Sequence, residues 1–220
     1  MATYYVSTSG SNSYPGTYSY PWLTWQYAFE QLSPGDTLYI RGGTYYSPNN
    51  GAAYDRITIT GTSSNRITIS NYSDEVPILD FSNVTTSSHT ECFGLVTDTD
   101  YVDFTGLILQ NLPEQDTNDF INMWRMLGSN TTINNCTVRY GGGRGFTTWD
   151  VDEFYFYNCD SYDHVDYLSE EDPGNDGYGF SNSGSNSSDR TYYYYCRAWG
   201  CGDDGFTAGG PSYVEYIGCW

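Results

Sequence analysis

The sequence predicts an all-β protein that folds as a right-handed parallel β-helix, a β-solenoid with a short N-terminal capping helix. Three observations predict it: a repeat near 23 residues, a series of short β-prone runs, and 24 Tyr beside 24 Gly in 220 residues. Tyr favours strands and Gly favours the tight turns between them. We expect a single β-helix domain over residues 1–220, with an N-terminal cap over about residues 1–45 and an incomplete C-terminal coil.

The repeat is marked by a dipeptide that follows each of five β-prone runs. The five dipeptides are Gly106-Leu107, Asn135-Cys136, Asn158-Cys159, Tyr195-Cys196 and Gly218-Cys219. The second and third are 23 residues apart, as are the last two. In a solenoid such positions stack ~4.8 Å apart, so Leu107 and the four cysteines should form one inward column. Stacked cysteines are compatible with disulfides or with free thiols that pack as small apolar groups.

A second register point indicates where the coils differ in length. Phe146 and Phe206 each follow a column cysteine by ten residues, and in the coil between them we place Gly177-Tyr178 at the same position. The extra residues of that coil then fall in the acidic stretch 163–176. Insertions of this kind gather on one side of a solenoid, which is usually the binding side.

The N-terminal part contains the one stretch with helical periodicity, residues 21–32, in which Trp25, Ala28, Phe29 and Leu32 form a stripe. We expect this helix to cover the first coil and to block edge-to-edge pairing. Alternating strands are predicted at 37–40, 57–60 and 67–70. At the other end the sequence stops at Cys219-Trp220, so we expect either a continuing chain or self-association through the open C-terminal coil.

Composition excludes some functions and favours others. The net charge of −19 argues against nucleic acid as a partner, because phosphates would be repelled. No apolar run approaches the ~20 residues of a membrane span. Six cysteines in an acidic chain rich in Asn, Ser and Thr suit an extracellular, secreted protein. Glycosylation sequons begin at Asn71, Asn83, Asn130, Asn135 and Asn186.

Beyond Asn158 the sequence resembles the pectate lyases of polysaccharide lyase family 9. The resemblance is carried by Asn158-Cys159-Asp160-Ser161-Tyr162, Gly174-Asn175-Asp176-Gly177-Tyr178, Cys196-Arg197-Ala198-Trp199 and Gly202-Asp203-Asp204-Gly205-Phe206. Residues 4–45 are similar to the first coil of the wider pectate-lyase-like superfamily. The resemblance implies a parallel β-helix, a Ca²⁺ cofactor and cleavage of an acidic polysaccharide by β-elimination.

By the same resemblance, Asp176, Asp203 and Asp204 occupy the Ca²⁺-binding positions. Stacked carboxylates repel one another, and a hard cation with oxygen ligands would relieve that repulsion; a solvated acidic loop is the alternative. Two positions depart from the family. Thr207 stands where the family has a further Asp, and the family's catalytic Lys has no counterpart, since all eight cationic side chains are Arg.

Candidates for the remaining roles are few. Arg144 and Arg197 are the candidate catalytic residues, against the simpler interpretations that Arg144 pairs with Asp176 and that Arg197 braces the acidic turn. Trp149 and Trp199, with the outward pair of Tyr192–Tyr195, could stack on sugar rings or form an aromatic ladder between coils.

Two functional interpretations follow. The first is a secreted, calcium-binding β-helix that acts on or binds acidic polysaccharide or another glycan, with activity weakened or lost without the Lys. The alternative is a structural subunit of an extracellular filament or surface assembly. The sequence leaves open whether the chain is an enzyme.

Overall fold

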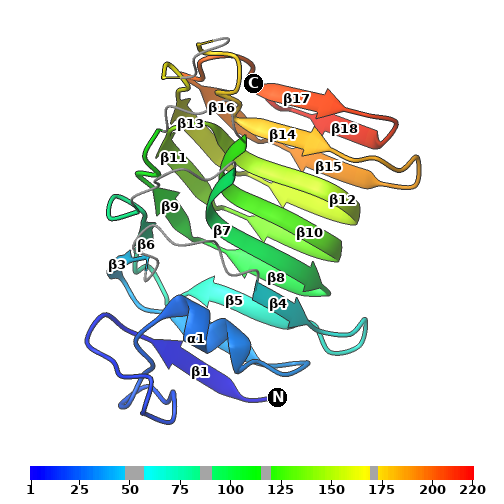
Figure 1. Ribbon diagram of the computed structural model, residues 1–220. Helices are drawn as coiled ribbons and strands as arrows, with labels where there is room; N and C mark the ends of the chain where they lie inside the picture. Colours follow the sequence, from blue (N-terminus) through cyan, green and yellow to red (C-terminus); the bar gives the residue numbers. More distant parts are fainter. Residues whose placement is uncertain (48–56, 85–90, 115–119, 169–172) are drawn as a thin grey trace.

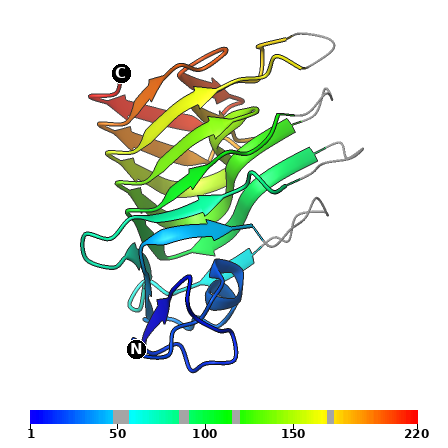
Figure 2. The same cartoon turned by 90° about the vertical axis from the view of Figure 1, so that its left-hand side faces the viewer.

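The structure is a computed structural model that describes residues 1–47, 57–84, 91–114, 120–168 and 173–220, without the side chains of residues 91–93 and 120. The chain winds into a right-handed parallel β-helix whose coils stack from the N-terminus at one end to the C-terminus at the other (Figures 1 and 2). All pairings between the strands named below are parallel.

Each full coil contributes to three faces. The first face consists of β1 (Thr3–Val6), β2 (Thr37–Ile40), β5 (Ile67–Asn71), β8 (Val102–Thr105), the C-terminal parts of β10 (Phe120–Asn134) and β12 (Arg144–Tyr157), β15 (Arg190–Tyr194) and β18 (Tyr213–Ile217). The second face consists of β3 (Gly43–Tyr46), β6 (Pro77–Asp80), β9 (Ile108–Gln110), β11 (Thr137–Gly141), β13 (Asp160–His164) and β16 (Arg197–Trp199). The third face consists of β4 (Ile57–Thr60), β7 (Glu91–Asp100), the N-terminal parts of β10 and β12, β14 (Phe180–Ser183) and β17 (Phe206–Gly209).

The predicted strands at 37–40, 57–60 and 67–70 are confirmed as β2, β4 and β5. In each of them, alternate side chains are buried, as the two-residue period of a strand requires. The interior is filled mainly by aromatic rings in the C-terminal half, where Phe146 and Phe180 stack at 5.1 Å and Phe180 and Phe206 at 4.8 Å. Burial of such rings, at about 25 cal/mol per Å² of apolar surface, is the main stabilising contribution to the fold.

The turn between the first and second faces explains the repeated dipeptide. Its first residue has a left-handed backbone in all five coils, with φ of 69° at Gly106, 50° at Asn135, 52° at Asn158, 56° at Tyr195 and 64° at Gly218. Gly and Asn tolerate this conformation better than other residues do. The next residue points inward: Leu107, Cys136, Cys159 and Cys196 are fully buried, and Cys219 is partly buried.

The inward column is therefore confirmed, and its cysteines are free thiols rather than disulfides. Each thiol lies near a carbonyl oxygen; Cys159 Sγ, for example, is 3.4 Å from the Tyr157 oxygen. Burial raises the pKa of the Cys136 thiol to about 12, which keeps it protonated and unreactive. Cys201 is also free, and the side chain of Cys92 lies outside the described residues.

Two local predictions need correction. The helix, α1, spans only Trp25–Glu30. The Thr24 side chain caps it by accepting from the Tyr27 backbone N–H, and the side-chain oxygen Oδ1 of Asn12 accepts from the backbone N–H groups of residues 23 and 24, which lie before the helix. Its buried side chains, Trp25, Ala28 and Phe29, still face the interior.

The second correction concerns the run Tyr192–Tyr195, in which alternation predicts two outward side chains. Tyr193 alone points inward, because Tyr195 occupies the left-handed turn and is exposed.

Candidate functional site

The candidate site lies at the corner between the second and third faces, where the chain passes from β11 to β12, from β13 to β14 and from β16 to β17. Phe146, Phe180 and Phe206 are register partners there. The predicted register was therefore wrong by two residues in the middle coil, since Gly179-Phe180 and not Gly177-Tyr178 matches the other two coils. Asp204 consequently aligns with Tyr178, and Asp176 does not stack on it.

Glycine is required where the three coils meet at this corner. A Cβ on Gly145 would lie 2.2 Å from Ser161 Oγ, and a Cβ on Gly179 would lie 2.6 Å from the Gly205 carbonyl oxygen. Both distances are shorter than real contacts allow. The close packing brings the residues that precede these glycines, Arg144, Tyr178 and Asp204, onto neighbouring coils.

Arg144 joins two of the coils. Its guanidinium forms a salt bridge with Asp176, in which Nε lies 3.2 Å from Oδ1, and its Cζ lies 5.2 Å from the centre of the Tyr178 ring. Tyr178 in turn hydrogen-bonds Asp203; burial, together with that carboxylate, raises the pKa of Tyr178 to about 12. The predicted pairing of Arg144 with Asp176 is confirmed.

Two acidic residues at this corner were missed by the sequence reasoning. Asp166 is only 4% exposed, and its pKa is raised by burial and by the charges of Asp176 and Glu114. Glu114 comes from the chain after β9 and accepts a hydrogen bond from the Leu168 backbone. The repeat spacing could not have brought Asp166 and Glu114 together, because both lie in connections between strands. The residues that the hydrogen bond joins, Glu114 and Leu168, are 54 residues apart.

The donor chemistry of this acidic corner, defined as Glu114, Asp166, Asp176, Asp203 and Asp204, fits a hard cation with oxygen ligands. The specific observation is the environment of Asp166: burial raises the pKa of this carboxyl most, and the charges of Asp176 and Glu114 raise it further. A cation would relieve that second, repulsive contribution. Within the described residues, however, no three acidic, His or Cys side chains already converge as a metal-binding group. Asp203 and Asp204 are exposed, and Asp176 is engaged by Arg144.

His164 lies directly behind the acidic corner and is fully buried. Its Nε2 is 3.1 Å from Ser161 Oγ, and that hydroxyl donates to the Gly179 carbonyl oxygen at 2.6 Å. The backbone carbonyl of His164 accepts from the Gly202 N–H at 2.7 Å. His164 therefore links the coils that carry Asp176 and Asp203. Burial lowers the pKa of its imidazole to about 4, so the ring is neutral near pH 7.

Arg197 forms a salt bridge, but its partner is Asp160 on β13 and not the acidic turn. The expectation that it braces the turn needs this correction: Arg197 and Asp160 are register partners on the second face, so the side chains meet across neighbouring strands. The pair ties two coils together at a distance from the acidic corner.

The two candidate tryptophans both have aromatic or cationic neighbours over their rings. Trp199 stacks on Tyr162 at 4.3 Å and lies 6.3 Å from Trp220, while Arg125 Cζ is 4.9 Å from the centre of the Trp149 ring. This geometry favours the ladder interpretation of Trp199 over a free platform for a sugar ring.

The sequons differ in accessibility. Asn135 and Asn186 are exposed, whereas Asn71, Asn83 and Asn130 are only partly so. The Asn71 and Asn83 amides also donate to backbone carbonyls, for example Asn83 Nδ2 to the Ser47 oxygen at 2.7 Å. Asn135 and Asn186 are the accessible candidates for glycosylation.

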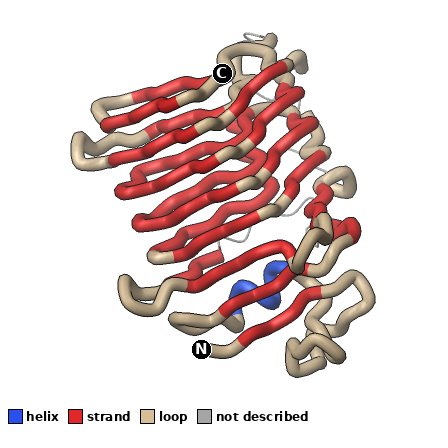
Figure 3. The backbone as a smooth tube through the Cα atoms, turned by 180° about the vertical axis from the view of Figure 1, so that it is seen from behind, coloured by secondary structure: helices blue, strands red, loops and turns tan. Residues whose placement is uncertain are grey.

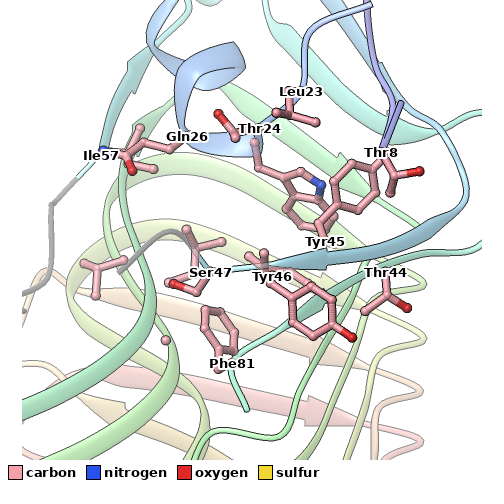
Figure 4. A pocket seen from close by; sticks show the side chains of 15 residues that line it. Thr8, Leu23, Thr24, Gln26, Thr44, Tyr45, Tyr46, Ser47, Ile57 and Phe81 are labelled. Atoms are coloured by element: carbon pink, nitrogen blue, oxygen red, sulfur yellow. The ribbon is translucent and has the colours of Figure 1, made fainter. Parts of the chain in front are cut away.

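A cavity of about 390 Å³ lies near the N-terminal end, beside α1 (Figure 4). Trp25, Tyr45, Leu79 and Phe81 give it a largely apolar wall, and Thr24 and Tyr46 also line it (Figure 4). None of the predicted site residues lines it. The cavity and the acidic corner are therefore separate features of the molecule.

A family model for the Pel9A-like right-handed β-helix region matches residues 4–220. The chain belongs to this family. Among curated proteins, a pectate lyase PEL9 of Emericella nidulans is 38% identical over 79 residues, which is 36% of this chain and 18% of that protein.

Solved structures of related β-helices extend over the whole chain. A rhamnogalacturonan lyase superposes with a TM-score of 0.89 at 23% identity, covering 100% of this chain and 57% of the other. Pectate lyase Pel9A superposes with a TM-score of 0.76 at 21% identity, covering 99% and 55%. These likenesses show the fold, and the chain spans little more than half of either protein. No helix among the described residues is long and apolar enough to cross a membrane.

Proposed function

We propose that this chain is the β-helix of a secreted protein of the polysaccharide-lyase type. It binds acidic polysaccharide of the galacturonate type in a Ca²⁺-dependent manner and cleaves it weakly or not at all. The observation that carries the proposal is the acidic corner, which lies on a β-helix of the Pel9A-like family and surrounds the nearly buried Asp166 with like charges. The names of the two relatives, a pectate lyase and a rhamnogalacturonan lyase, support the substrate class.

Asp166, Asp176, Asp203 and Asp204 would hold the cation, with Glu114 beside them. When bound, Ca²⁺ would neutralise a uronate carboxylate and so acidify the neighbouring C5 proton. Arg144 positions Asp176 through its salt bridge. A cation at Asp176 would compete for that carboxylate and free the guanidinium to bind a substrate carboxylate in the bidentate manner typical of Arg.

The base that removes the C5 proton has no obvious counterpart. The chain has no Lys, and Arg is too basic to accept a proton near neutral pH. Both candidate arginines are engaged by carboxylates, and His164 is buried. We therefore propose weak or absent elimination together with Ca²⁺-dependent binding of the polymer.

The test is to incubate the protein with polygalacturonate or rhamnogalacturonan and Ca²⁺, while following ultraviolet absorbance from unsaturated products and measuring polymer binding by calorimetry. We expect binding that requires Ca²⁺ and is lost in Asp176→Asn, while Asp74→Asn, an exposed carboxylate elsewhere, binds like the parent. Binding that ignores both Ca²⁺ and Asp176 would contradict the proposal. Rapid turnover that survives Arg144→Ala would show that the base lies elsewhere.

A structural role in an extracellular filament or surface assembly is the second proposal. Tyr216, Ile217 and Trp220 of the last coil are exposed apolar side chains, and exposed strands and apolar surface favour association with another chain. Light scattering across a salt series tests it: growth of the particles with added salt supports assembly, and a monomer at high protein and salt concentration contradicts it.

A further inference from the structure

The first face consists of eight paired strands, which are among those that Figure 3 shows from behind as a backbone trace. The strand register places two columns of side chains on the outer surface of this face. One column consists of Tyr5, Tyr39, Ser70, Thr105, Asn134, Tyr157, Tyr194 and Ile217; the other consists of Thr3, Thr37, Thr68, Asp103, Thr132, Tyr155, Tyr192 and Glu215. All sixteen side chains are at least partly exposed, and the residues between them are buried, apart from Tyr4 and Tyr216 in the first and last of these strands. We call this surface the hydroxyl face.

The hydroxyl face is chemically uniform. Twelve of its sixteen side chains are Thr, Ser or Tyr, and none is cationic. It has two carboxylates, of which Asp103 is paired with Arg66 at 2.5 Å. Six of the sixteen side chains are Tyr, against 24 of 220 in the whole chain. Enrichment in Tyr is a property of binding surfaces.

Four tyrosines form a regular grid on this face. Tyr155 and Tyr192 stack at 4.8 Å with 7° between the rings, and Tyr157 and Tyr194 stack at 5.0 Å with 12°. Along each strand the ring centres are 6.4 and 6.5 Å apart. Because the ring faces cover one another, the grid presents ring edges and hydroxyls. The Tyr155 hydroxyl donates to Glu153, and the Tyr194 hydroxyl donates to Glu215 at 3.3 Å. The grid therefore offers rows of hydroxyls instead of a flat ring on which one sugar could stack.

We propose that the hydroxyl face is a binding surface for an uncharged, extended polysaccharide of the β-1,4-linked glucan type. Tyr and Thr hydroxyls both donate and accept hydrogen bonds, which suits a polymer whose own surface consists of hydroxyls. None of the sixteen side chains is cationic, and the neighbouring Arg66 is already paired with Asp103, so the net charge would repel an acidic polymer. Straight rows along the axis of the β-helix suit a straight chain, and many weak contacts add up along a polymer.

This surface is independent of the acidic corner. The hydroxyl face lies on the first face, whereas the acidic corner lies between the second and third faces. Binding at the hydroxyl face needs no Ca²⁺ and does not depend on the proposed function. The two surfaces together would hold the protein on a neutral polymer while the acidic corner engages an acidic one.

The experiment is depletion of the protein from solution by microcrystalline cellulose, measured with EDTA present and again in high salt. We expect binding that survives both conditions. The double replacement Tyr157→Thr with Tyr194→Thr should weaken the partition constant tenfold or more. The matched control is Tyr14→Thr with Tyr20→Thr, because these two rings also contact each other, at 5.6 Å, are exposed and belong to neither column.

A second variant guards against effects on folding. Thr132→Lys places a charge in the middle of the face without removing any ring, and it should abolish cellulose binding while leaving the melting temperature within a degree or two of the parent. Absence of binding by the parent would overturn the proposal, as would equal binding by the Tyr157/Tyr194 variant or loss of binding with EDTA. A dimer that forms through this face, detected by light scattering and broken by Thr132→Lys, would overturn it too, since a second copy would then be the occupant.

Discussion

His164 has a protonation state that is set by burial. The pKa of its imidazole is about 4 in the folded chain, against about 6.5 in an unfolded chain. The folded state therefore binds the proton less tightly than the unfolded state does. Its contribution to stability is complete above pH 6.5 and is lost as the pH falls toward 4.

We expect His164→Gln to remove about 3 kcal/mol of the pH dependence of the unfolding free energy between pH 7 and pH 4, because Gln has no proton to gain. The measurement is a set of urea unfolding curves for both proteins, with EDTA present to keep metal out of the comparison. Carboxylates titrate in the same range, so the quantity to compare is the difference between the two slopes. Equal slopes would mean that the imidazole is not the group that titrates.

Arg144 compensates for the crowding of carboxylates at the acidic corner. Replacing it by Gln leaves Asp176 near Asp166 without its cation, and we expect a loss of about 1–3 kcal/mol of unfolding free energy. Millimolar Ca²⁺ should restore part of this loss. The matched control is Arg190→Gln, which breaks exposed pairs with Asp152 and Glu153 and should cost less, because solvent screens exposed ion pairs. Equal losses in the two variants, measured by thermal unfolding, would contradict the account.

The contacts of these residues differ in how well the sequence alone predicts them. The pairing of Arg144 with Asp176 could be predicted, because both positions follow from the coil register to within two residues. Asp166 and Glu114 could not, because they meet through connections between faces, and periodicity does not describe the path of a connection. Tyr178 was misplaced for a similar reason: Gly177-Tyr178 and Gly179-Phe180 are equivalent as glycine–aromatic pairs, and only the packing of Phe180 between Phe146 and Phe206 separates them.

At the level of strands and turns, the left-handed residue before the inward column position was encoded in the sequence by Gly or Asn in four of the five coils, Tyr195 being the exception. The side chain that holds together the turn between the third and first faces could not be recognised from the sequence. Asn182 on β14 is buried, and its amide donates to Thr148 Oγ1 at 2.9 Å and to Thr191 Oγ1 at 2.8 Å. Its carbonyl accepts from Ser212 Oγ at 2.7 Å. One side chain thereby joins β12, β14, β15 and the turn before β18.

We expect Asn182→Ala to cost about 2–3 kcal/mol, since it leaves buried hydroxyls without partners. Chemical unfolding of the purified variant measures this. Asn134→Ala, on the outer surface of the first face and partly exposed, is the control and should change stability by less than about 0.5 kcal/mol. A small effect at Asn182 would mean that water replaces the amide.

For the molecule as a whole, the net charge of −19 makes every cation stabilising to some degree, so a specific ion must be separated from general screening. We expect Ca²⁺ to raise the melting temperature more than NaCl at the same ionic strength. A folded-state site occupied at 100 times its dissociation constant adds about 2.7 kcal/mol. The double replacement Asp203→Asn with Asp204→Asn should abolish the difference and Asp74→Asn should not. An equal rise with both salts in the parent protein would count against the site.

The in-register stacking of coils has a consequence for how such a molecule changes over time. Each coil pairs only with the coils beside it, so its cross-section and its length are set independently. Duplication or loss of one whole coil would shift the ends of the molecule by ~4.8 Å and leave the neighbouring contacts intact. A change of a few residues within a coil would instead break the register of everything stacked on it. Evolution can thus lengthen such a β-helix by whole coils. Smaller variation in sequence length concentrates in the connections between faces.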